Sequence, residues 1–279
     1  MAQLSIHFYS NCLHRCTTFQ MIIPNDKRKD GFPPFEDGKD AEKPMKTLFL
    51  LHGYTGDAGN WVPEWLCEKY NFAIVTPSGE NSFWLDAEAT GHQYATFVGV
   101  ELVDYVRRTF NLARTPEDTC IMGMSMGGFG ALHTAFQFPD VFGKTAALSS
   151  ALIHYEVAKM KPEGGIDGKG GNDVANYAYY RECFGEPSKL LESDANPETL
   201  VKKILAGTLK TVSGAKPKMP EIFMACGTED FLLEPNRTFH RFLDEQGVKH
   251  VYMESKGVHD MIFWQEYATK FVPMMFGIV

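Results

Sequence analysis

The sequence lacks three features that would each point to a particular class of protein. No apolar run approaches the length of a membrane span, so we expect no transmembrane helix. Lys and Arg number 27 against 35 Asp and Glu, and the net charge of −8 argues against nucleic acid as a partner. Residues 1–8 contain neither a basic segment nor an apolar core, so we expect no signal peptide and no membrane partner.

The six cysteines are scattered and include no C-x-x-C motif. Cys12 and Cys16 stand close together, but no second pair with metal-ligand spacing follows, so we expect no metal. Cys120 and Cys226 fall within apolar runs, where a free cysteine behaves as a small hydrophobic residue. The cysteine pattern and the missing signal peptide together favour a reduced, cytoplasmic setting.

Strand and helix patterns alternate along most of the 279 residues. Apolar runs at 4–10 and 16–23, separated by a short polar segment, indicate an N-terminal antiparallel hairpin. Buried strands are then expected at 45–51, 72–76, 119–122, 145–148, 221–225 and 248–254, and helices at 61–70, 91–110, 128–138, 235–246 and 261–276. This order predicts an α/β fold with a mostly parallel central sheet and helices on both faces.

Two segments interrupt this order. Residues 24–44 are charged and contain several Gly and Pro, which predicts a long surface loop. Residues 153–217 contain a run of glycines and then Tyr177, Tyr179 and Tyr180. We interpret 153–217 as a cap-like excursion over the site, so the whole chain, 1–279, is predicted to be one domain.

The stretch 119–130 carries the strongest chemical signal. It contains G-x-S-x-G, as Gly123-Met124-Ser125-Met126-Gly127, between an apolar run and a helical pattern. In that strand–turn–helix context the motif predicts a nucleophile elbow, because small residues let the chain bend sharply and hold the Ser125 Oγ above the sheet. The motif alone is also typical of a glycine-rich turn with an incidental serine, so the prediction depends on its partners.

A nucleophilic serine needs a base and an orienting acid, and in a parallel sheet these lie on loops at the carboxyl ends of strands. Asp230 follows the strand expected at 221–225, and His259 follows the strand expected at 248–254. Serine, then acid, then histidine is the chain order of α/β-hydrolases. We therefore predict that Ser125, Asp230 and His259 form a catalytic triad.

Each member of this triad has a competing interpretation. Asp230 alone also fits a turn or helix-capping acid, and a lone histidine such as His259 fits a surface or core group. The neighbouring candidates for the acid and the base are Glu229, Asp260, His240 and His250. Chain order and placement on strand-end loops favour Asp230 and His259.

A glycine-bearing loop, His52-Gly53-Tyr54, follows the strand expected at 45–51. A tetrahedral oxyanion needs two N–H donors, one from the residue after the nucleophile and one from the first strand–helix loop. We assign these donors to the backbone N–H groups of Met126 and Tyr54. Gly53 is then expected beside the substrate, with His52 as a buttress of the loop.

Together these motifs resemble the esterase D family of α/β-hydrolases, which includes S-formylglutathione hydrolases, tributyrin esterases, and acetyl and hydroxycinnamoyl esterases. The resemblance spans essentially the whole chain and is strongest to the bacterial tributyrin esterases. It rests on His52–Gly56 with Asn60-Trp61, Asn81–Asp86, Gly123–Gly130, Cys226–Leu232, and Gly257–Asp260 with Trp264. It implies an α/β-hydrolase fold with an N-terminal hairpin and an insertion over the site, and assembly into a homo-oligomer.

The resemblance implies a serine carboxylesterase that acts on short-acyl or hydroxycinnamoyl esters through an acyl-enzyme on Ser125. The partner is then a small-molecule ester, and no cofactor is needed. Five aromatic side chains are expected to line the pocket, although aromatic residues near such a site more often belong to the core: Tyr54, Trp61, Trp84, Phe129 and Trp264.

Three other functions stay open, one of which is acyl transfer to an acceptor other than water; the other two can be weighed against the sequence. The first is an S-formylglutathione hydrolase or another thioesterase; those hydrolases tend to carry serine-glycine-leucine where this chain has His52-Gly53-Tyr54, which argues against it. The second is a non-catalytic α/β-hydrolase-like binding protein, and the presence of all three triad residues argues against that function.

Overall fold

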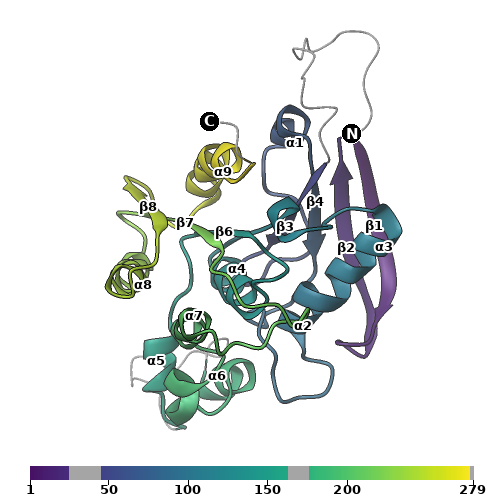
Figure 1. Ribbon diagram of the computed structural model, residues 1–279. Helices are drawn as coiled ribbons and strands as arrows, with labels where there is room; N and C mark the ends of the chain where they lie inside the picture. Colours follow the sequence, from purple (N-terminus) through teal and green to yellow (C-terminus); the bar gives the residue numbers. More distant parts are fainter. Residues whose placement is uncertain (25–44, 163–175, 277–279) are drawn as a thin grey trace.

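The computed structural model describes residues 1–24, 45–162 and 176–276, and these residues contain one eight-stranded sheet (Figure 1). The strand order is β1-β2-β4-β3-β5-β6-β7-β8. The strands are β1 (Ala2–Ser10), β2 (Arg15–Ile23), β3 (Lys46–Leu51), β4 (Phe72–Pro77), β5 (Thr119–Met124), β6 (Lys144–Leu148), β7 (Glu221–Gly227) and β8 (His250–Ser255). β1 and β2 form an antiparallel hairpin, β2 pairs antiparallel with β4, and the other pairs are parallel. The predicted α/β-hydrolase sheet and its hairpin are confirmed.

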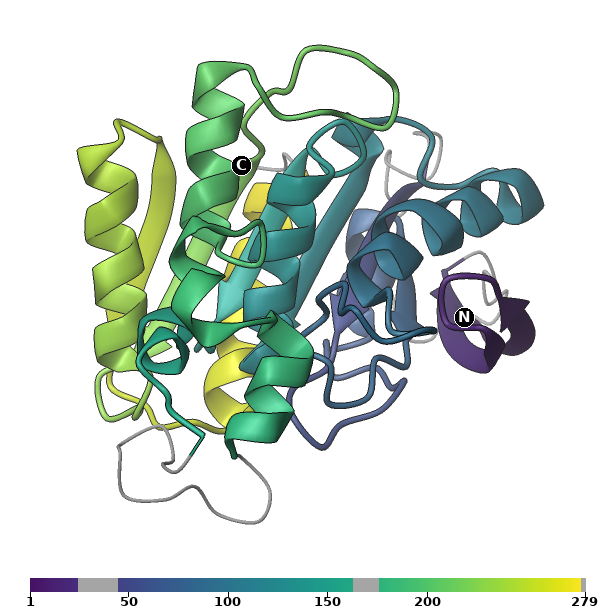
Figure 2. The ribbon, with the colours of Figure 1, turned by 90° about the horizontal axis from the view of Figure 1, so that it is seen from below.

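Side chains alternate between the two faces of each strand, so the sheet separates two apolar cores. Leu48 and Leu50 of β3 point to one core, and Phe49 and Leu51 point to the other. The first core is covered by α1 (Trp65–Tyr70) and α9 (Met261–Phe276). The second is covered by α2 (Tyr94–Thr96), the π-helical η2 (Phe97–Leu102), α3 (Val103–Phe110), α4 (Met126–Gln137), α7 (Pro197–Ala206) and α8 (Leu233–Glu245), which Figure 2 shows from their own side.

Two predicted helices begin later than the sequence pattern suggests. Helix α1 starts at Trp65, two residues after Pro63. The long helix expected from Gly91 starts at Tyr94, because Gly91 has a left-handed φ of 78° that no helix residue adopts. Its middle, η2, is wound as a π-helix around Gly99, where an added Cβ would lie 2.1 Å from the Phe138 ring.

The described part of the predicted excursion is helical. It contains α5 (His154–Ala158), α6 (Tyr177–Phe184), the short 3-10 segment η4 (Pro187–Glu192) and α7. The remaining element, the 3-10 turn η3 (Pro116–Asp118), precedes β5. The glycine run at 164–171 and nearly all of the loop predicted at 24–44 lie outside the described residues. The role of 153–217 as a cap therefore stays a prediction.

None of the helices in the described ranges combines the length and the apolar character that crossing a membrane demands.

Candidate active site

Ser125 stands between the end of β5 and the first residue of α4, as the elbow motif predicts. Its backbone has φ 55° and ψ −121°, a conformation that residues with a side chain rarely adopt. Three backbone hydrogen bonds hold it there. The Ser125 N–H donates to the Leu148 carbonyl at 2.8 Å, and the Ser125 carbonyl accepts from the N–H groups of Phe129 at 3.1 Å and Ala151 at 2.9 Å.

Both glycines of the motif are required by close approach of backbone atoms. A Cβ on Gly123 would lie 2.0 Å from the Gly127 carbonyl oxygen, and a Cβ on Gly127 would lie 2.4 Å from the Leu51 carbonyl oxygen. The first contact makes the turn tight, and the second brings the start of α4 against the end of β3. The loop that follows β3 is therefore fixed directly beside Ser125.

The side chains of Ser125, His259 and Asp230 form one hydrogen-bonded chain. His259 Nε2 lies 2.9 Å from Ser125 Oγ, and His259 Nδ1 lies 2.9 and 3.1 Å from the two carboxylate oxygens of Asp230. Because an ionised carboxylate only accepts, His259 Nδ1 carries the ring proton, and Nε2 can accept the hydroxyl proton of Ser125. Ser125, Asp230 and His259 follow the carboxyl ends of β5, β7 and β8, respectively. Because these strands are parallel, the three residues lie at the same end of the sheet.

The carboxylate of Asp230 is enclosed and fully hydrogen-bonded. Its side chain has no exposed surface, and it accepts the Leu232 N–H at 2.9 Å as well as the His259 proton. Burial disfavours the charged form, but hydrogen bonds from His259, Leu232 and Ser149 outweigh burial and hold the pKa of Asp230 below its usual value. The acid is therefore charged at neutral pH and fixes the orientation of the imidazole.

The alternative acids and bases have other partners. Glu229 is exposed and lies 4.0 Å from the Lys256 ammonium group. Asp260 accepts the Phe263 N–H at 2.9 Å at the start of α9, as a helix cap does. His240 and His250 contact each other, with ring nitrogens 2.6 Å apart.

His52 braces the loop predicted to bind the oxyanion. Its Nε2 accepts the Gly79 N–H at 2.9 Å, so its Nδ1 carries the proton and donates to the Gly53 carbonyl at 2.8 Å. Burial lowers the pKa of His52, which keeps the ring neutral and suits this pair of hydrogen bonds. The Trp84 indole N–H donates to the His52 carbonyl at 3.2 Å and ties a second segment to the loop.

The two predicted oxyanion donors flank Ser125. Met126 is the first residue of α4, so its N–H is one of those without an acceptor inside the helix. On the other side, Gly53 approaches the nucleophile closely: a Cβ added to it would lie 3.4 Å from the Ser125 Cβ. Tyr54, the next residue, is partly buried. Their roles as donors stay a prediction.

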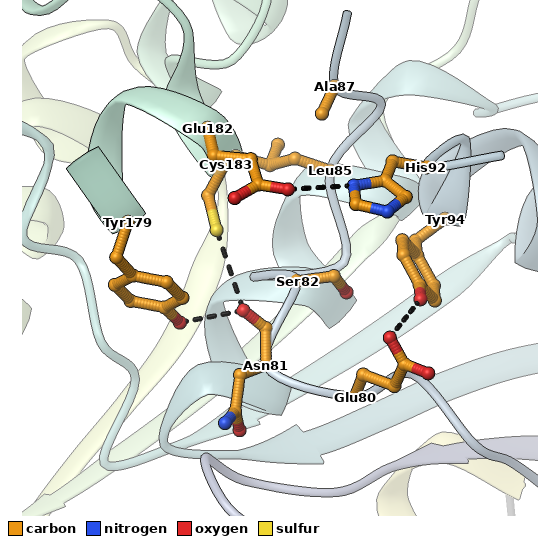
Figure 3. Close-up of a pocket in the computed structure, with 10 residues that line it drawn as sticks. All are labelled: Glu80, Asn81, Ser82, Leu85, Ala87, His92, Tyr94, Tyr179, Glu182 and Cys183. Atoms are coloured by element: carbon orange, nitrogen blue, oxygen red, sulfur yellow. Dashed lines mark hydrogen bonds and ion pairs between the residues drawn. The ribbon is translucent and has the colours of Figure 1, made fainter. Parts of the chain in front are cut away.

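A pocket of about 140 Å³ lies beside this loop (Figure 3). The Tyr179 hydroxyl donates to the Asn81 carbonyl at 2.7 Å across it, and the Asn81 side-chain oxygen accepts the Thr55 N–H at 2.8 Å. The rings of Tyr54 and Tyr179 meet edge to face at 5.8 Å. The pocket lining comes from 80–94 and α6 and consists of Glu80, Asn81, Ser82, Leu85, Ala87, His92, Tyr94, Tyr179, Glu182 and Cys183.

Three of the five aromatic residues expected in the pocket are core residues. Trp84 and Phe129 have no exposed surface, and Trp61 is 6% exposed. Trp84 is buried because Gly79 and Gly130 make room for its indole: an added Cβ at either would lie 2.3–2.5 Å from that ring system. These three side chains are therefore packed in the two cores and do not line an open surface.

Trp264 is different, because it borders the predicted base. It is partly buried and meets the His259 ring at a right angle, with centroids 4.9 Å apart. Its indole N–H donates to Ser149 Oγ at 3.1 Å, and the same Ser149 hydroxyl interacts with Asp230. Phe231 borders the histidine from another side, with centroids 4.6 Å apart and 76% of the residue exposed.

Sequence reasoning missed Phe231 and Ser149. Phe231 directly follows Asp230, so its position beside the triad was the available signal. Ser149 directly follows the strand expected at 145–148, which is the strand before the one that leads to Asp230. The signal that could have identified it is a polar residue at the carboxyl end of that strand.

The chain was compared with known proteins. Residues 34–275 match the family model described as "Putative esterase". An acetyl esterase of Caldicellulosiruptor saccharolyticus is 40% identical over 275 residues, which cover 96% of this chain and 95% of the relative. This chain belongs to that esterase family. The protein is accordingly a carboxylic ester hydrolase, and the predicted resemblance to the esterase D family is confirmed.

Solved structures agree with the fold of this esterase. Substrate-bound FphF, a fluorophosphonate-binding serine hydrolase of Staphylococcus aureus, superposes with a TM-score of 0.77 at 24% identity, covering 99% of this chain and 98% of FphF. An S-formylglutathione hydrolase from Staphylococcus aureus superposes with a TM-score of 0.76 at 24% identity, again covering 99% and 98%. At this identity the likeness establishes the α/β-hydrolase fold alone.

Proposed function

We propose that this esterase hydrolyses short-acyl esters, with a preference for acetyl esters, through a covalent acyl-enzyme on Ser125. The observation that carries the proposal is the hydrogen-bonded chain from Ser125 Oγ through His259 to the buried Asp230 carboxylate. The preference for acetyl is supported by the relative named acetyl esterase, which matches almost the full length of both chains. Hydroxycinnamoyl esters are the second acyl class to test.

In the proposed mechanism, His259 Nε2 accepts the Ser125 hydroxyl proton while Oγ attacks the ester carbonyl carbon. Asp230 stabilises the imidazolium that forms. The backbone N–H groups of Tyr54 and Met126 would donate to the tetrahedral oxyanion. His259 then protonates the departing alcohol, and a water molecule activated by the same histidine releases the acid and restores the Ser125 hydroxyl.

The placement of the two aromatic rings around His259 suits the alcohol part of the ester. The leaving oxygen must approach His259 Nε2 to take its proton, so the group attached to that oxygen lies on the histidine side of the site. Phe231 and Trp264 are the two aromatic rings that contact the imidazole. We therefore expect an aryl or alkyl alcohol to contact these rings, and the acyl group to lie toward the Gly53 loop.

The test is a hydrolysis panel on the wild type, Ser125→Ala and Ser188→Ala, where Ser188 is an exposed control serine. The panel contains p-nitrophenyl acetate, butyrate and octanoate, methyl ferulate, acetylated xylan and S-formylglutathione. We expect the acetate to be turned over fastest, Ser188→Ala to match the wild type, and Ser125→Ala to lose about 10⁴–10⁶ in kcat. Full turnover by Ser125→Ala would overturn the proposal.

The same panel separates the alternatives. Dominant hydrolysis of the thioester would assign the protein to the thioesterases and keep Ser125 as nucleophile. No turnover together with no labelling of Ser125 by a fluorophosphonate probe would favour a non-catalytic binding protein. A homo-oligomer and a cytoplasmic location stay predictions, which light scattering and cell fractionation can test.

A further inference from the structure

Three potential metal ligands meet between α8 and β8, outside the Ser125 site. His240 and Asp244 lie one turn apart on α8, which places both on one face of the helix. His250 is the first residue of β8, the last strand of the sheet. One ligand atom from each side chain lies within 4.8 Å of the others. The closest approach is 2.6 Å, between His240 Nδ1 and His250 Nε2.

The hydrogen bonds of His250 fix which nitrogen offers a lone pair. His250 Nδ1 lies 2.8 Å from the Val248 carbonyl, which only accepts, so Nδ1 carries the proton of the neutral ring. The lone pair on Nε2 then points toward His240. A backbone carbonyl bonded to the distal N–H is the usual support of a metal-ligating histidine. His240 is also oriented, because its ring stacks on Tyr252 with centroids 4.4 Å apart.

The Asp244 carboxylate lies against the other ring nitrogen of His240, with its oxygen 3.6 Å from His240 Nε2. His240 therefore has a metal-ligating group beside each of its two ring nitrogens, His250 at Nδ1 and Asp244 at Nε2. A bound cation would account for this convergence of two imidazoles and a carboxylate.

We propose that His240, Asp244 and His250 bind a divalent transition metal of the Zn²⁺ type. Imidazole favours Zn²⁺, Cu²⁺ and Ni²⁺, whereas Mg²⁺ and Ca²⁺ prefer oxygen ligands. Tetrahedral coordination at Zn–N distances of about 2.0–2.1 Å places two ligating nitrogens about 3.3 Å apart. The two imidazole nitrogens, 2.6 Å apart here, must therefore separate by about 0.7 Å, and Asp244 must close in. The Asp244 side chain is 62% exposed and the His240 side chain 32%, so both can move, and water can take the fourth position.

A metal at this site would join the edge strand to its covering helix. Asp244, Lys249 and His250 line a surface depression, so the ion can enter from solvent. α8 begins three residues after Asp230, and β8 ends four residues before His259. The expected effect is therefore a more stable C-terminal edge of the sheet, with no part for the metal in ester hydrolysis.

The test is calorimetric titration of the EDTA-treated, full-length protein with ZnCl₂, together with thermal melts. We expect one Zn²⁺ per chain, a higher Tm with Zn²⁺, and no competition from Mg²⁺. His250→Ala and Asp244→Asn should each weaken binding by about 10-fold or more. His7→Ala removes a histidine on β1 that is hydrogen-bonded to Thr18, and it should bind as the wild type does.

Two controls keep the result decisive. The exposed Asp244 can be changed without disturbing the core, so Asp244→Asn tests the site even if His250→Ala fails to fold. Substitution by Co²⁺ separates this site from the cysteines, because thiolate ligands add an intense charge-transfer band that nitrogen and oxygen ligands lack. No binding by the wild type, unchanged binding by Asp244→Asn, or a thiolate band would each overturn the proposal.

Discussion

Replacing Gly127 by alanine tests whether the contact between the elbow and β3 sets the geometry of the site. Gly127 is the second residue of α4, and an added Cβ would lie 2.4 Å from the Leu51 carbonyl oxygen and 2.5 Å from that of His52. Both distances are about 1 Å short of an ordinary contact of 3.4 Å. Because both neighbours are backbone atoms, no rotation of a side chain can relieve the overlap.

Two effects of opposite sign decide the stability of this variant. Helix propensity alone favours alanine over glycine by about 0.8–1 kcal/mol. The overlap opposes it, since inserting a methyl group into a packed interior costs about 1–3 kcal/mol, and more where the backbone must move. We expect the overlap to win and the free energy of unfolding to fall by about 2 kcal/mol.

The same overlap should also impair catalysis in the protein that remains folded. Relief requires the end of β3 to move away from α4, which draws Gly53 away from Ser125. Loss of one oxyanion donor lowers kcat by about 10²–10³. We therefore expect a loss of that size in the hydrolysis of p-nitrophenyl acetate, measured on folded protein.

Urea unfolding and steady-state kinetics on matched samples provide the assay. Gly59→Ala is the control, because a Cβ there would meet only the Asp57 carbonyl oxygen, at 3.8 Å. Its stability should stay within about 0.5 kcal/mol of the wild type. If Gly127→Ala is as stable as the wild type and keeps most of its kcat, the contact between α4 and β3 does not position the oxyanion loop.

Three further predictions follow from buried polar contacts. His52→Ala leaves the Gly79 N–H without its acceptor, so urea unfolding should show a loss of about 1–3 kcal/mol, together with a lower kcat. Asn236→Ala removes two hydrogen bonds between α8 and the backbone of Ser150, one donated to its carbonyl at 2.8 Å and one accepted from its N–H at 3.3 Å, and a similar loss is expected in the same assay. The pKa of Asp230 is lowered in the folded state, so its ionisation stabilises the fold above the unfolded value of about 3.9, and this contribution disappears as the pH falls through the folded pKa. The stability gap between the wild type and Asp230→Asn should therefore be constant from about pH 5 to 7 and shrink below about pH 4; a gap that widens in acid would contradict this assignment.

The fold was largely predictable because its signals are local. Continuous apolar runs mark strands that are buried on both faces, and α9 has the predicted bounds, Met261–Phe276. The elbow was predictable for the same reason, since the glycines around Ser125 act on backbone atoms within a few residues. The sequence pattern did not indicate the π-helical turn in η2; within it Gly99 lies against the ring of Phe138, which directly follows α4 and is distant in the sequence.

The sequence predicted the positions of site residues that chain order constrains. It did not predict the positions of residues that depend on tertiary packing. Ser125, Asp230 and His259 come together as chain order suggested, although their catalytic roles still await the variants proposed above. Trp84 was also predicted to line the pocket, yet it fills a space between Gly79 and Gly130, and Gly130 belongs to α4, which is distant from Trp84 in the sequence. Ser149 contacts Asp230 because β6 and β7 are neighbours in the sheet, a pairing that their succession in the chain suggests but does not fix.

The backbone conformation of Ser125 has a consequence for how this protein can change over generations. A serine at φ 55° and ψ −121° is strained, and such strain costs about 1–3 kcal/mol, whereas glycine would adopt the same angles with little penalty. Selection for thermal robustness alone would therefore replace the nucleophile with glycine, which has no side chain to attack an ester. Position 125 is therefore a site of trade-off between stability and activity. A search for more stable variants should keep Ser125 and vary the residues around it.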